Sequence, residues 1–180
     1  MRSLLPAVVV ALAALLAVTG GCGRESSHMS GGRYFDTEHK FSIELPRGWE
    51  RREDFSGSVV SALRPADNET KEFRENVGVL VEEVPPTTGL KDYMVATVEN
   101  AGRVLSGFRV LDAGDITLAG GSGAWLAYSH NVEGMSLDVL LYATLSGGRA
   151  CVIVCSAKSD RMSRFRRLFE RVASSFRLED

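Results

Sequence analysis

Apolar residues recur along the chain in the patterns that buried β-strands require. Phe41, Ile43 and Leu45 alternate with polar side chains, which predicts a strand with one buried face. Residues 58–64 and 76–84 are apolar on both faces, which indicates strands that are covered from both sides. Glycines at the intervening turns favour an antiparallel meander for the strand candidates that follow, at residues 108–118, 124–129, 137–145 and 149–157.

Two later segments carry apolar residues at helical spacing instead. The first follows Thr88, a candidate cap, and its apolar residues are Leu90, Met94, Val98, Ala101 and Leu105. The second follows Ser159 or Asp160 as the cap, and its apolar stripe is Phe165, Leu168, Phe169, Val172 and Phe176. We therefore expect an α+β fold in which an antiparallel sheet of about six to eight strands has helices packed on both faces.

Residues 1–21 predict a signal peptide. One arginine precedes an apolar run from Leu4 to Val18, and small residues then lead to Cys22. An uncleaved membrane anchor is the alternative. The run has 15 residues, however, which is fewer than the roughly 18 that argue for a spanning helix, and Pro6 near its start also disfavours a permanent anchor.

Residues 18–22, Val-Thr-Gly-Gly-Cys, resemble the lipobox of bacterial lipoproteins, in which the cysteine sulfur receives diacylglycerol before cleavage. Thr19 departs from the pattern, which usually has a large aliphatic residue at that place. The resemblance implies lipidation of Cys22, and the alternative is ordinary cleavage that leaves Cys22 as a free thiol. Gly23 stands where an aspartate tends to hold Gram-negative lipoproteins at the inner membrane, so the resemblance favours the periplasmic face of the outer membrane.

Residues 22–32 are polar and rich in glycine and serine, which predicts a flexible tether between the lipid and a domain of residues 33–180. Cleavage after residue 21 removes Arg2, so 20 of the 21 Lys and Arg remain, against 23 Asp and Glu. This balance lacks the strong basic excess that is typical of nucleic-acid-binding domains. We expect one domain that is a monomer or a weak oligomer, with no nucleic-acid partner.

The order of these motifs resembles the PsbP-like superfamily, which includes DcrB-like and Mog-like proteins. The stretches that carry the resemblance are residues 41–49, 75–79, 118–120, 125–128 and 174–176. It implies an antiparallel sheet with helices on both faces and a role as a binding or assembly factor. It implies no catalytic motif and no cofactor, because the metal associations of the photosynthetic members depend on contacts that have no match in this chain.

The chain offers few residues for catalysis or metal binding. Cys151 and Cys155 lie on the same face of one strand but too far apart for a disulfide, so we expect two buried thiols. A metal site would need more ligands than His39 and His130 provide. Ser122 lies among glycines, but a strand follows it where a nucleophile or phosphate loop needs a helix, so we expect a hairpin turn. We therefore expect neither an enzyme nor a bound metal.

Four arginines, Arg161, Arg164, Arg167 and Arg171, lie beside the apolar stripe of the last helix. Basic residues near an anionic membrane each contribute about 1 kcal/mol, so this row is a candidate contact with a membrane or a partner. The alternative is an ordinary solvated helix face, in which Glu170 offsets part of the charge.

Two functions are compatible with these features. The first is a non-enzymatic envelope lipoprotein that binds an envelope protein or helps to assemble or maintain a membrane complex. The second is a carrier of an apolar small molecule, held between a helix and the sheet in a pocket lined by Trp125, Tyr128 and Tyr142.

Overall fold

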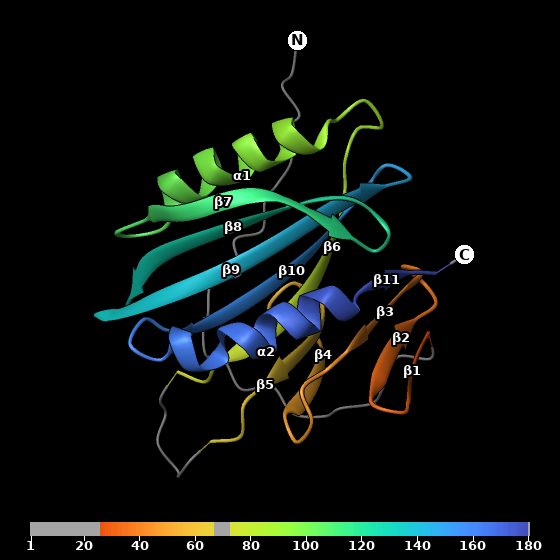
Figure 1. The fold of residues 1–180 in the computed structure, drawn as a ribbon, viewed down its shortest axis with the longest axis horizontal. Coiled ribbons are helices and arrows are strands. Elements are labelled where there is room, and N and C mark those ends of the chain that lie inside the picture. The colour runs from red at the N-terminus through yellow and green to blue at the C-terminus, as the bar shows by residue number, and fades with distance from the viewer. Residues whose placement is uncertain (1–25, 67–72, 180) are drawn as a thin grey trace.

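The computed structural model describes residues 26–66 and 73–179, which form two sheets and two helices (Figure 1). The helices are α1 (Leu90–Val104) and α2 (Met162–Ser175). The strands of the larger sheet are β4 (Glu50–Phe55), β5 (Ser58–Leu63), β6 (Asn76–Glu83), β7 (Arg109–Leu118), β8 (Gly121–Val132), β9 (Met135–Ser146) and β10 (Arg149–Lys158). The strands of the smaller sheet are β1 (Ser27–Ser30), β2 (Arg33–Asp36), β3 (Phe41–Glu44) and β11 (Arg177–Leu178).

The larger sheet is antiparallel and has the strand order β4-β5-β6-β10-β9-β8-β7. Its strands β7 to β10 pair consecutively, so the predicted meander is confirmed. The turn between β9 and β10 uses Gly147 and Gly148 at φ of 57° and 75°, a region that side chains disfavour. β10 pairs with β9 along one edge and with β6 along the other, and Val79 of β6 lies opposite Ile153 of β10 in the middle of the sheet.

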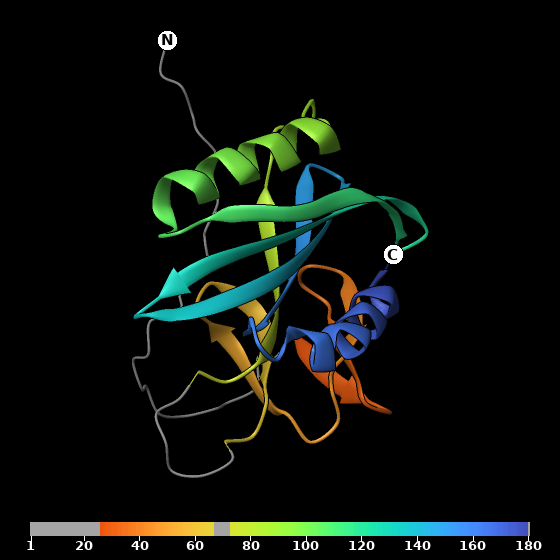
Figure 2. The same ribbon diagram turned by 60° about the vertical axis from the view of Figure 1, so that its left-hand side comes forward.

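Helices cover both faces of the larger sheet. Figures 1 and 2 show α1 on one face, and α2 together with the smaller sheet on the other. The expected α+β fold is thus confirmed. The larger sheet has seven strands, within the expected range, and a second, smaller sheet formed by β1, β2, β3 and β11 packs beside it.

An apolar core lies on each side of the larger sheet. Under α2, Phe41, Phe169 and Phe176 are fully buried, and the rings of Phe41 and Phe176 stack with centroids 5.5 Å apart. Under α1, Tyr93 and Leu105 are buried in a second cluster with side chains of β6, β8, β9 and β10. Each buried side chain of this size contributes roughly 1.5–3 kcal/mol, so packing on the sheet stabilises both helices.

Neither helix begins with the cap that the sequence suggests. The residue before α1 is Gly89 and the residue before α2 is Arg161, and neither makes a capping hydrogen bond through its side chain. Ser159 instead donates its hydroxyl proton to Asp138 at 2.6 Å. The buried side chain of Met162 holds the start of α2 against the core.

The first described strand precedes the predicted domain boundary at residue 33. Ser27–Ser30 form β1, which pairs with β2, and the Ser27 hydroxyl donates to the Glu53 carboxylate at 3.1 Å. The prediction of a flexible tether over residues 22–32 is therefore wrong for its second half, because an edge strand needs hydrogen bonds rather than apolar side chains. The predicted signal peptide and Cys22 lie outside the described residues. No helix within residues 26–66 and 73–179 is long and apolar enough to span a membrane.

Candidate functional site

Three exposed arginines on α2 form no ion pair with any residue in 26–66 or 73–179. Arg164, Arg167 and Arg171 lie at positions i, i+3 and i+7, so they share one side of the helix. Within the described part of the chain, no ion pair or side-chain hydrogen bond involves any of them. The structure thus brings these three together as the helical spacing predicts, and we call them the α2 arginine surface.

Arg161 does not belong to this surface. It precedes α2, and its Nη1 lies 3.5 Å from Oε1 of Glu75, a fully buried residue just before β6. Arg64, just after β5, places its Nε 2.7 Å from the other carboxylate oxygen of Glu75. Two guanidinium groups therefore neutralise one buried carboxylate. The expectation that Arg161 extends the exposed row is wrong, because Arg161 forms an ion pair with Glu75, which is distant in sequence.

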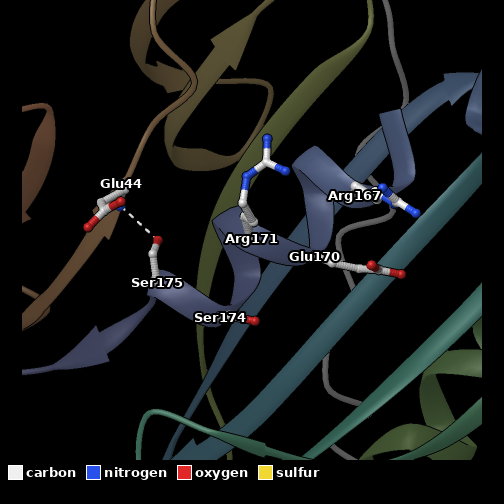
Figure 3. A pocket seen from close by; sticks show the side chains of 6 residues that line it. All are labelled: Glu44, Arg167, Glu170, Arg171, Ser174 and Ser175. Carbon is white, nitrogen blue, oxygen red and sulfur yellow. Dashed lines mark hydrogen bonds between the residues drawn. The ribbon is translucent and has the colours of Figure 1, made fainter. Parts of the chain in front are cut away.

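An open depression lies beside the α2 arginine surface, between α2 and the end of β3 (Figure 3). Its volume is about 510 Å³, and it is lined by Glu44, Arg167, Glu170, Arg171, Ser174 and Ser175. Ser175 fixes one wall, because its hydroxyl accepts a hydrogen bond from the Glu44 backbone N–H at 2.9 Å and donates to the Val172 carbonyl at 2.6 Å. Figure 3 shows Arg167 and Arg171 projecting from successive turns of α2.

The two acids that line the depression are already paired with other arginines. Glu44 Oε1 lies 2.9 Å from Arg33 Nη2, and Glu170 Oε1 lies 3.8 Å from Arg166 Nη1. Each of these acids is thus matched by an arginine outside the α2 arginine surface. The depression is left with a local excess of positive charge, which attracts anionic groups.

The three aromatic residues predicted to line one pocket lie on opposite faces of the larger sheet. Trp125 and Tyr142 are paired across β8 and β9 and pack in the core under α2. Tyr128 packs in the core under α1, because residues three apart on a strand point to opposite faces. Burial raises the pKa of Tyr128 to about 12. The prediction that these three side chains line one pocket is wrong, so they do not support the carrier function.

Cys151 and Cys155 are buried free thiols, as predicted. Both belong to the core under α2. Burial raises the pKa of Cys151 to about 11 and also raises the pKa of Cys155. Protonated thiols in this apolar setting pack as small apolar groups.

The two histidines of the predicted domain lie in separate environments. His39 Nδ1 is 2.9 Å from Oδ1 of Asp36, whose side chain is fully buried at the end of β2. His130 is buried on β8 beside Tyr128, and burial lowers its pKa. Within the described residues, no group of three or more His, Cys, Asp and Glu side chains is placed to hold a metal ion.

The depression and the buried acid beside α2 could not be located from the sequence. Glu44 belongs to β3 and the other residues of the depression belong to α2, so no local pattern joins them. Glu75 ends a charged segment that has the composition of a solvated loop. Its position immediately before a strand that is apolar on both faces is the only local sign of burial.

Comparison with solved structures identifies the fold. The chain is similar to CyanoP, the cyanobacterial PsbP of Synechocystis sp. PCC 6803, with a TM-score of 0.62, 24% identity, and coverage of 91% of this chain and 98% of CyanoP. It is similar to LpqN of Mycobacterium tuberculosis, described as involved in cell envelope biogenesis, with a TM-score of 0.60, 15% identity, and coverage of 78% and 83%. It is also similar to the Ran-binding protein Mog1p of Saccharomyces cerevisiae, with a TM-score of 0.59, 12% identity, and coverage of 85% and 97%.

These similarities show that the chain has the PsbP/Mog-like fold, as the order of its motifs predicts. No protein-family model and no curated protein matches the chain.

Proposed function

We propose that the chain uses its PsbP/Mog-like fold as a membrane-tethered accessory module of the cell envelope, which binds partners and catalyses no reaction. The observation that carries the binding role is the α2 arginine surface, whose guanidinium groups are exposed beside an open depression and make no ion pair or hydrogen bond with the residues that the structure describes. Uncompensated charge of this kind suits an anionic partner, either an acidic protein or the anionic surface of the membrane itself. Two proteins with this fold support the role, since Mog1p is named for binding Ran and LpqN for its involvement in cell envelope biogenesis.

The tether in this proposal is a lipid on Cys22, which follows from the lipobox-like residues 18–22. Diacylglycerol supplies two acyl chains, and stable anchoring takes two such signals where a single chain binds only marginally. Because Gly23 follows the cysteine, we place the anchored protein on the periplasmic face of the outer membrane in a Gram-negative cell.

The tether is tested by cell fractionation. Cys22→Ser should move the protein from the membrane fraction to the soluble fraction, whereas Cys151→Ala, which changes a buried thiol, should leave it in the membrane. A density gradient that separates the two membranes then tests the placement. Retention of Cys22→Ser in the membrane would contradict the lipid tether, and recovery in the inner membrane would contradict the placement.

The binding role is tested in cells that are crosslinked before lysis. Pull-down of the tethered protein should recover the same envelope protein in repeated experiments, and Cys22→Ser should recover less of it because the tether concentrates both at one membrane. Recovery of only abundant, unrelated envelope proteins would contradict the binding role.

A further inference from the structure

The α2 arginine surface and β1, the first described strand, lie on the same side of the larger sheet. Figures 1 and 2 show α2 and the strands β1 to β3 on one side of the larger sheet, with α1 on the other. Arg33 of β2 donates a hydrogen bond to the Ser175 carbonyl at 2.8 Å and so links the smaller sheet to the end of α2. The chain therefore enters the fold on the side that carries the α2 arginine surface.

Little chain separates this side of the domain from the proposed lipid. β1 begins at Ser27, so only residues 23–26 lie between it and Cys22. A chain spans at most about 3.3–3.6 Å per residue, so the five steps from Cys22 to Ser27 reach at most about 18 Å. The inference below rests on the proposed tether: a lipid on Cys22 holds the α2 side of the domain close to the headgroups.

We propose that the α2 arginine surface lies on the membrane and binds the phosphate groups of anionic lipids. The planar guanidinium group donates two parallel hydrogen bonds to phosphate oxygens, which makes arginine well suited to this ligand. The depression is open, so it fits a layer of headgroups better than a single small anion. The net charge around the depression is positive, because Glu44 is matched by Arg33 and Glu170 by Arg166, and the three arginines remain.

The contact orients the domain as well as strengthening its attachment. Each arginine at an anionic surface strengthens partitioning roughly fivefold, so three together strengthen it about a hundredfold. The domain then rests on its α2 side, and α1 on the opposite face of the larger sheet points away from the lipid.

The test couples the chain from residue 22 onward to vesicles through the Cys22 thiol and a maleimide lipid. Cys151 and Cys155 do not compete, because both are buried and their pKa values are raised. The vesicles contain phosphatidylcholine alone or with about one third phosphatidylglycerol, which supplies the anionic surface that the contact requires. Because the coupling is chemical, its outcome does not depend on whether cells lipidate Cys22, so failure here and failure of the proposed tether are separate results.

Phenylglyoxal then modifies accessible arginines, and mass spectrometry gives the rate at each position. We expect Arg164, Arg167 and Arg171 to react about fivefold more slowly on anionic than on neutral vesicles, and high salt should remove the difference. Arg103 is the internal control, because it is exposed on α1, on the opposite side of the sheet, and should react at the same rate on both vesicles.

Three outcomes would overturn the proposal. Equal slowing at Arg103 would mean that anionic vesicles exclude the reagent generally. Equal rates on the two kinds of vesicle at Arg164, Arg167 and Arg171 would favour an acidic protein as the partner. Slowing by inorganic phosphate alone, without vesicles, would identify a small-anion site.

A matched pair of variants separates a local contact from net charge. Arg167→Gln with Arg171→Gln and Lys91→Gln with Arg103→Gln each remove two positive charges, all of them exposed. With Cys22→Ser chains at low salt, we expect the first pair to lower partitioning into anionic vesicles roughly 30-fold and the second less than about threefold. Lysine at positions 167 and 171 should retain most of the binding. If the two pairs lowered partitioning equally, binding would depend only on the net charge of the protein, and the proposal would be overturned.

Discussion

Removal of the buried charge at Glu75 should destabilise the protein more than any loss of a surface ion pair. The Glu75 side chain is fully buried and lies between Arg64 at 2.7 Å and Arg161 at 3.5 Å. The Glu75 carbonyl also accepts a hydrogen bond from the Arg64 backbone N–H at 2.8 Å. One residue thus connects the end of β5, the start of β6 and the start of α2.

Glu75→Gln keeps the size of the side chain and removes its charge. Breaking a buried ion pair by neutralising one partner costs about 3–5 kcal/mol, because the other charge is left uncompensated. Arg64 and Arg161 retain 22% and 33% side-chain exposure, so water can partly solvate them after the change. We therefore expect a loss of about 2–3 kcal/mol, below the range for complete burial.

The measurement is urea unfolding at pH 7, followed by circular dichroism, with Glu50→Gln as the matched control. Glu50 also contacts two arginines, Arg74 and Arg52, which lower its pKa and keep it charged, but its side chain is 44% exposed. Surface ion pairs contribute at most about 1 kcal/mol, so the control should lose no more than that. A loss below about 0.5 kcal/mol for Glu75→Gln, or equal losses for both variants, would refute the reasoning.

Three further predictions concern the packing of the sheet and its buried groups. Gly123→Ala should cost about 1–3 kcal/mol in urea unfolding, because the new methyl group would lie 2.7 Å and 3.2 Å from its nearest neighbours, whereas Gly121→Ala, with its nearest neighbour at 3.9 Å, should be close to neutral. Iodoacetamide should leave Cys151 and Cys155 unmodified in the native protein and label both in urea, and rapid native labelling would contradict their burial. Burial lowers the pKa of His130, so the unfolded state binds its proton more readily and stability should decrease as pH falls below about 6.5. His130→Gln should show a smaller decrease between pH 7.5 and 5.5, and identical pH profiles would show that His130 does not contribute.

The strands that could be predicted are those with a buried face. β3 and the meander from β7 to β10 were expected because their apolar residues follow a strand pattern and glycines separate them. β4 was not expected, since Glu50–Phe55 contains mainly charged residues and lies at the edge of the larger sheet. Edge strands are defined by hydrogen bonds to one neighbour, which leave no periodic signal in side-chain polarity.

The candidate site could be predicted only as far as its residues share one helix. Helical spacing correctly grouped Arg164, Arg167 and Arg171, but it also included Arg161, because nothing local indicates a contact with a buried acid from another segment. Trp125 and Tyr128 lie on opposite faces of β8. Side chains alternate along a strand, so two residues three apart cannot line the same pocket between helix and sheet.

The smaller sheet joins segments from opposite ends of the described chain, and this affects the order in which the protein can fold. β3 pairs with β2 on one edge and with β11 on the other, and Leu178 of β11 lies opposite Phe41. Strands β7 to β10 form hairpins as soon as they emerge, because each pairs with its neighbour in sequence. β3 must wait with one edge unpaired until residues 177–178 arrive. In the proposed export, β3 therefore keeps one unpaired edge until the end of the described chain has emerged, and a chaperone that protects the emerging chain would have to act there.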